Sequence, residues 1–180
     1  MVARFMLLVT VSCLPFLGAC GHGAGDEAAR LSAEGYRDMA GNRFEDAFQK
    51  LERAVDLRPD VADYHIGLGM AAARLGKMDV AEKQYVSAEG ILAREAEHDP
   101  ERVDDQVFIL ALLGRPAEAR HALSNGLVRF PDSRTIQQLD GSRDSLLAVR
   151  ELPEWRQYAI TNVEPADAPE ERPAVPVGRP

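Results

Sequence analysis

The sequence is poor in aromatic residues, in cysteine and in positive charge, and each shortage excludes a class of protein. Phe, Trp and Tyr make up 6% of the 180 residues, which disfavours a sandwich or barrel of aromatic-rich strands. Two cysteines cannot build a disulfide scaffold. Lys and Arg number 21 against 29 Asp and Glu, and the net charge of −8 argues against a nucleic-acid binder, which needs clustered positive charge.

The composition that remains favours packed helices. Hydrophobic residues make up 46% and charged residues 28%, so most of the chain can bury a core. Ala, Leu and Arg are abundant, and these residues suit helices better than strands. We therefore predict an all-α fold.

The N-terminus has the pattern of an export signal. Arg4 gives a positive start, and residues 5–16 form a mostly apolar stretch, too short to cross a bilayer that needs about 20 residues. Leu17-Gly18-Ala19-Cys20 follows, and this order resembles the bacterial lipoprotein signal, in which the cysteine receives a diacylglyceryl group before cleavage. The alternatives are an ordinary secretory signal cut after Ala19, or a buried apolar segment.

The lipoprotein resemblance implies a signal peptide at residues 1–19 and an acylated N-terminus at Cys20, which holds the chain on a membrane without spanning it. Lipoproteins kept in the inner membrane often have Asp after the cysteine, so Gly21 favours the outer membrane. Residues 20–26 are predicted to be a flexible tether, and residues 161–180 a disordered, acidic, Pro-rich tail.

A unit of about 34 residues recurs in the middle of the chain. Ala47 and Ala81 are 34 positions apart, and Ala119 lies 38 beyond Ala81, which indicates a four-residue insertion. A large residue follows each alanine by four positions and a small residue by seven; these are Leu51, Tyr85 and Leu123, then Ala54, Ala88 and Gly126. Upstream, Gly35 matches Gly69, and the third copy has Val107 instead.

This pattern resembles the tetratricopeptide repeat, in which helix A and helix B pair antiparallel and a proline follows helix B, as Pro59 and Pro131 do here. Helices approach to about 8–10 Å only where the crossing residues are small. A plain helical bundle gives no reason for small residues to recur in register.

The resemblance implies an α-solenoid of about three helix-turn-helix repeats within residues 27–131, at about 28–60, 61–98 and 99–131. A capping helix and a short helical turn are predicted in residues 132–160, with Trp155 folded back onto the array. Asp60 and Asp99 are predicted helix N-caps. The second copy lacks the closing proline, so its helix B is expected to run on toward His98.

The family's concave face is lined by helix A, and the same register in this chain predicts a groove that binds a protein or peptide. Its apolar floor would suit a peptide or an amphipathic helix, with acidic residues at one end. The alternative is that half of these residues only pack neighbouring helices. The predicted groove residues are Tyr36, Met39, Asp63, Ile66, Met70, Arg74, Asp104 and Phe108, with Ser32, Glu101 and Leu112 in the same register.

No arrangement of nucleophile and base indicates an enzyme, and we expect no cofactor and no metal. Glu95 and His98 are spaced as a metal pair on a helix, but no third ligand follows at a known spacing. The surrounding acidic run is expected to be solvated, or to receive a basic partner.

These observations together predict a lipid-anchored, periplasm-facing scaffold that binds another protein of the cell envelope. Small tetratricopeptide lipoproteins include pilotins and assembly factors for secretins and pili, and this chain is similar in size and layout. The alternatives are an adaptor that regulates cell-wall enzymes, and a carrier of a metal or small ligand that uses His98 and the nearby acids. Fold alone does not decide among them.

Overall fold

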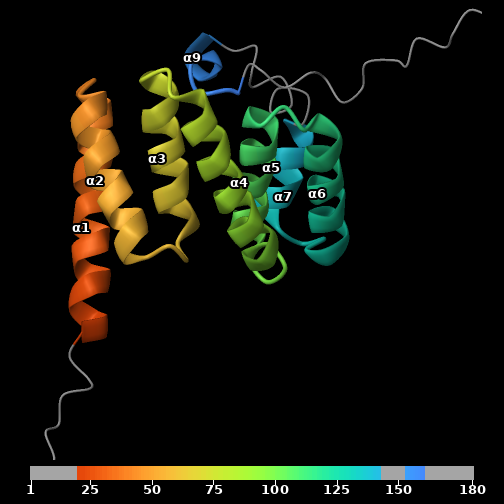
Figure 1. Cartoon of the computed structure of the whole chain (residues 1–180). Helices are drawn as coiled ribbons and strands as arrows, with labels where there is room; N and C mark the ends of the chain where they lie inside the picture. The colour runs from red at the N-terminus through yellow and green to blue at the C-terminus, as the bar shows by residue number, and fades with distance from the viewer. Residues whose placement is uncertain (1–19, 143–152, 161–180) are drawn as a thin grey trace, which may run out of the picture.

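The computed structural model describes residues 20–142 and 153–160, and the regular elements within them are helices. Helix α7 packs on α5 and α6, and the short helix α9 follows later in the chain. The helix pairs stand side by side in Figure 1, which confirms the predicted all-α repeat solenoid. The helices are α1 (Cys20–Ala40), α2 (Phe44–Leu57), α3 (Ala62–Arg74), α4 (Met78–Glu95), α5 (Pro100–Leu112), α6 (Pro116–Arg129), α7 (Arg134–Gly141) and α9 (Pro153–Arg156).

The same tight turn joins the two helices of each pair. Asn42, Gly76 and Gly114 have positive φ angles of 56°, 73° and 73°. The residue after each donates its backbone N–H to a carbonyl five residues back, at 2.8–2.9 Å. Glycine adopts this left-handed conformation without strain and asparagine tolerates it, so the helix ends at the same register in every copy.

The small residues of the repeat lie where the helix axes cross. A Cβ on Gly35 would lie 2.7 Å from Cγ of Leu51, and one on Gly69 would lie 2.5 Å from Cε1 of Tyr85. Leu51 and Tyr85 are completely buried, and burial of such a side chain contributes roughly 1.5–3 kcal/mol. The small-large-small positions of helix B are buried in all three pairs: Ala47, Leu51, Ala54, Ala81, Tyr85, Ala88, Ala119, Leu123 and Gly126.

The helix boundaries follow most of the expected signals. Helix α4 has 18 residues, whereas α2 and α6 have 14 each, because no proline ends it. Asp99 caps α5 by accepting a hydrogen bond from the backbone N–H of Glu101 at 2.9 Å. The predicted cap by Asp60 is wrong: α3 begins after Val61, because both carboxylate oxygens of Asp60 are bound by Arg58 at 2.8 and 2.9 Å.

An ion cluster ties α1 to α2 beside the first turn. Asp38 is only 5% exposed, and its carboxylate accepts hydrogen bonds from Lys50 and Arg43. These hydrogen bonds, the one from Lys50 first, hold the pKa of Asp38 below its ordinary value. The carboxylate therefore stays charged at a lower pH than an ordinary aspartate does.

The N-terminal end of the array differs from expectation. Helix α1 begins at Cys20, so residues 20–26, predicted to be a flexible tether, are helical. Ala24, Ala28 and Ala29 favour a helix, and extending an existing helix adds one hydrogen bond per residue. This end of α1 extends beyond α2 in Figure 1, and a Cβ on Gly23 would meet nothing within 4 Å.

Several predicted segments lie outside the described residues. They are the signal peptide at 1–19, residues 143–152 of the region predicted to cap the array, and the tail at 161–180. Among the helices that are described, none is both long enough and apolar enough to cross a membrane.

Candidate protein-binding surfaces

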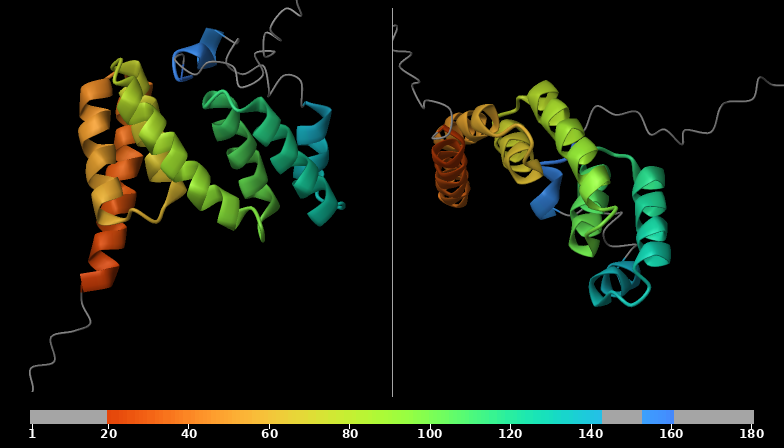
Figure 2. Two further views of the ribbon diagram at one scale, coloured as in Figure 1. Left: turned by 45° about the vertical axis from the view of Figure 1, so that its right-hand side comes forward. Right: turned by 90° about the horizontal axis from the view of Figure 1, so that it is seen from below.

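The helices alternate between two sides of a curved array. Seen from below in Figure 2, α1, α3, α5 and α7 lie along the inner side, and α2, α4 and α6 lie along the outer side. The short helix α9 lies on the inner side, beside α3 and α5. All eight predicted groove residues belong to α1, α3 and α5, so the sequence register assigned them to the helices of the inner side.

One end of this side is acidic. The Arg102 guanidinium contacts Asp63 at 3.1 Å, Asp105 at 2.9 Å and Glu95 at 3.3 Å, and so links α3, α4 and α5. One positive group among three carboxylates leaves a local negative excess. Burial, with the charge of Asp105 next to it, raises the pKa of Asp104 above its ordinary value.

Tyr36 connects α1 to this acidic end. Its hydroxyl donates a hydrogen bond to the backbone carbonyl of Asp63 at 2.7 Å, and a Cβ on Gly67 would lie 2.9 Å from its Cζ. Burial of the phenol, followed by the charges of Asp63 and Asp105, raises the pKa of Tyr36. The residue as a whole nevertheless remains 37% exposed, so part of Tyr36 is open to a partner.

Other members of the helix A register serve packing. Met39 packs against the core around Leu51 and Ala47. Ser32 is 6% exposed and Leu112 is completely buried. Ser32 and Leu112 therefore stabilise the array, whereas Met39, like Ile66 and Met70, packs on a core cluster and remains partly exposed.

Between the acidic end and the helix turns, the inner side is apolar. Ile66, Met70 and Phe108 are partly buried and pack against one central core cluster. Arg74 lies at the far end of α3, with its guanidinium carbon 3.9 Å from the centre of the Phe44 ring. An arginine above an aromatic face is held by cation–π attraction and keeps its N–H donors available.

Residues 155–160, named the C-terminal segment below, already lie on this apolar part. The ring of Trp155 meets Phe108 edge to face, with centroids 4.9 Å apart, as the predicted return of Trp155 to the array requires. Arg74 donates to the hydroxyl of Tyr158 at 3.4 Å. Two predicted groove residues, Arg74 and Phe108, thus come together around the C-terminal segment.

Backbone hydrogen bonds complete this contact. The Tyr85 hydroxyl donates to the carbonyl of Tyr158 at 3.0 Å, and the N–H of Ile160 donates to the carbonyl of Leu112 at 3.0 Å. Ala159 and Ile160 are each 1% exposed. The sequence analysis did not predict that Phe44, Tyr158 and Ile160 contribute to this contact. The spacing of the two aromatic residues Trp155 and Tyr158 could have indicated it.

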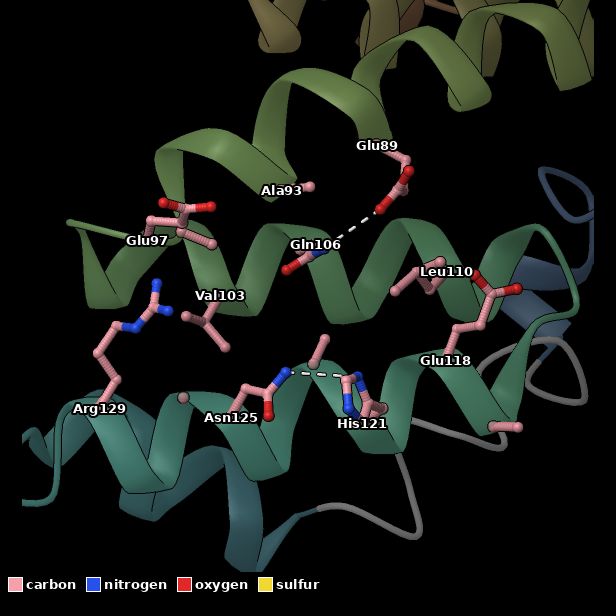
Figure 3. Close-up of a pocket in the computed structure, with 14 residues that line it drawn as sticks. Glu89, Ala93, Glu97, Val103, Gln106, Leu110, Glu118, His121, Asn125 and Arg129 are labelled. Atoms are coloured by element: carbon pink, nitrogen blue, oxygen red, sulfur yellow. Dashed lines mark hydrogen bonds between the residues drawn. The ribbon is translucent and has the colours of Figure 1, made fainter.

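A concavity of about 500 Å³ opens on the outer side between α4, α5 and α6 (Figure 3). Gln106 donates to Glu89 across it at 3.2 Å, and Asn125 lies 3.3 Å from the ring of His121. Apolar side chains such as Val103 also line it. Sequence reasoning did not find this concavity, although the four-residue insertion before α6 marks the place where the regular repeat is interrupted.

The hypothesis that Glu95 and His98 bind a metal ion requires a further ligand nearby. In residues 20–142 and 153–160, no group of three or more His, Cys, Asp or Glu side chains could hold a metal ion. Glu95 is engaged by Arg102 at 3.3 Å, and His98 is exposed.

Comparison with known proteins agrees with the repeat register. Residues 32–96 match the family model of the tetratricopeptide repeat. The match runs from within α1 through the end of α4, and so covers most of the first helix pair and all of the second. No curated protein sequence matches the chain.

Proposed function

The chain is a tetratricopeptide repeat protein, a family that generally provides non-catalytic scaffolds for protein binding, and from this we propose that its inner face holds a polypeptide partner. The observation that carries the proposal is that a polypeptide, the C-terminal segment, already lies on the apolar part of this face through aromatic contacts and hydrogen bonds. We use the name inner face for Tyr36, Asp63, Ile66, Met70, Arg74, Asp104 and Phe108.

The chemistry of the inner face suits an amphipathic segment. Its centre offers Ile66, Met70 and Phe108, and methionine adapts to irregular apolar surfaces. The acidic end attracts a basic group, since Asp63, Asp105 and Glu95 share one arginine. The partner fitting this face has an apolar stripe with positive charge at one end.

The proposed location is the periplasmic side of the outer membrane, with acyl chains on Cys20 as the anchor. Support comes from the signal-like residues 1–19, the Leu17-Gly18-Ala19-Cys20 box and the Gly21 that follows it. Cys20 is the first residue of α1, at the end that extends beyond α2 in Figure 1. Anchoring there would hold a bound client near the membrane and raise its effective concentration without new contacts.

The proposed task is assembly or stabilisation of an envelope complex, as pilotins do for secretins and pili. Affinity capture from solubilised envelopes tests this with three chains: wild type, Tyr36→Ala/Ile66→Ala, and Val128→Ala. Val128 is 84% exposed on α6 and is the matched control. Circular dichroism would first establish that all three chains are equally helical.

We expect wild type and the Val128 control to retain a secretin or pilus component that the inner-face variant loses. Equal recovery by all three chains would contradict binding at the inner face. Recovery dominated by cell-wall enzymes would favour the adaptor function over complex assembly.

A further inference from the structure

We propose that the C-terminal segment is a displaceable internal ligand of the inner face, and that the partner displaces it with a segment of the same chemistry. That chemistry is two aromatic side chains three residues apart and an aliphatic residue two positions later, as in Trp155, Tyr158 and Ile160. The inference rests on the proposed function, because it names the kind of partner that the inner face receives.

The contacts have the form of peptide recognition. Tyr158 accepts through its backbone carbonyl, and Ile160 donates through its backbone N–H, so these two hydrogen bonds are available to any chain in that position. Their counterparts, the Tyr85 hydroxyl and the Leu112 carbonyl, are fixed features of α4 and α5. Burial of the Tyr85 phenol raises its pKa, so the hydroxyl remains a donor at neutral pH.

Side chains add selectivity to this backbone pairing. Trp155 meets the edge of Phe108, and its ring centroid is 5.8 Å from that of Tyr158. The Tyr158 hydroxyl accepts from Arg74. A competing segment therefore needs an aromatic ring against Phe108 and a phenol or another acceptor facing Arg74.

The C-terminal segment combines two buried residues, Ala159 and Ile160, which belong to the central core cluster, with two aromatic side chains at the surface. Helix α9 has four residues, far below the length that is stable alone, so its order depends on the docked side chains. Trp155 and Tyr158 both remain partly exposed, and the bond between Arg74 and Tyr158 is long at 3.4 Å. A partner that makes the same contacts over a longer segment can replace it.

Self-occupancy sets a threshold for partner binding. The segment belongs to the same chain, so its competition with a partner is intramolecular and does not depend on the protein concentration. If the face is closed about 90–99% of the time, the apparent affinity for a partner is lowered about 10–100-fold. Releasing the segment should restore that affinity.

The test uses the full-length chain in detergent and a fluorescein-labelled peptide with the sequence of residues 153–160, followed by fluorescence anisotropy. The released variant is Trp155→Ala/Tyr158→Ala. The blocked variant adds Phe108→Ala to it, and Val128→Ala is the control. We expect the peptide to bind the released variant at least about 10-fold more tightly than wild type, with binding lost in the blocked variant and the control equal to wild type.

Equal affinity for wild type and the released variant would overturn the proposal. So would a helical released variant that binds no peptide, because the C-terminal segment would then be a fixed structural element. If the released variant fails to fold, wild type decides the question, because Trp155 is the only tryptophan of the chain. Excess peptide carrying Phe in place of Trp should shift Trp155 emission to the red, and unchanged emission would refute displacement.

The two proposals fail separately. If the peptide binds the released variant but no chain captures an envelope partner, the proposed function is refuted and the proposal of an internal ligand stands. If partner capture depends on Tyr36 and Ile66 but the peptide does not bind, the proposal of an internal ligand is refuted and the proposed function stands.

Discussion

Replacing Gly69 by alanine should destabilise the protein, although alanine is the better helix former. The new Cβ would lie 2.5 and 2.7 Å from Cε1 and Cδ1 of Tyr85. Tyr85 is completely buried and its hydroxyl is bonded to Tyr158, so its ring cannot move aside without losing that hydrogen bond. Overpacking of this kind costs roughly 1–3 kcal/mol, and the absence of an escape route favours the upper part of that range.

Gly90 is the matched control, because it lies inside α4 of the same repeat and an added Cβ would meet nothing within 4 Å. Removing a helical glycine there should stabilise the protein by about 0.5–1 kcal/mol. The same gain offsets part of the cost at Gly69, which leaves a net loss of about 1–2 kcal/mol for Gly69→Ala.

Urea denaturation followed by circular dichroism measures both variants, and we expect changes of opposite sign. If Gly69→Ala were as stabilising as Gly90→Ala, Gly69 would not lie at a tight helix crossing, and the packing argument would be refuted.

Four further predictions concern single groups. Tyr85→Phe removes the hydrogen bond to the C-terminal segment and should lower stability by about 0.5–1.5 kcal/mol in urea denaturation; unchanged hydrogen exchange at Ile160 would contradict this role. Asp38 has a lowered pKa, so its stabilisation is present above its ordinary pKa near 3.8 and is lost as pH falls through the lowered value. Asp38→Asn should therefore destabilise at pH 7, with the difference from wild type closing in acid. Asp104 has a raised pKa, so its charged form opposes folding and Asp104→Asn should stabilise at pH 7; a loss of stability would show that its carboxylate is favourably bound. Cys20→Ser should move the protein from the membrane to the soluble fraction, and unaltered fractionation would exclude the lipid anchor.

The repeat architecture could be predicted because it follows from local and recurring constraints. Gly35 and Gly69 mark the helix crossings, and Ala47 and Ala81 recur at the same spacing, so one register fixes the helix pairs. The left-handed turn at Gly76 obeys the same register. Each of these residues acts within one repeat or between neighbours, where sequence distance and spatial distance agree.

The surface was less predictable, because contacts distant in sequence decide it. Trp155 was expected to return to the array, but nothing in the spacing indicated that Arg74 would lie between Phe44 and Tyr158. The outer concavity depends on the angle between α4 and α6. The spacing of repeat residues in the sequence does not determine that angle. The cap at Asp60 failed for a local reason, since Arg58 competes for the same carboxylate.

The most direct test of the central claim places a photoreactive amino acid at Ile66 on the inner face or at Asn125 in the outer concavity, in cells that make the membrane-anchored chain. We predict that an envelope protein is crosslinked from Ile66 and not from Asn125. Crosslinking of that protein from Asn125 alone would mean that the partner binds the outer side, and the account of the inner face would be wrong.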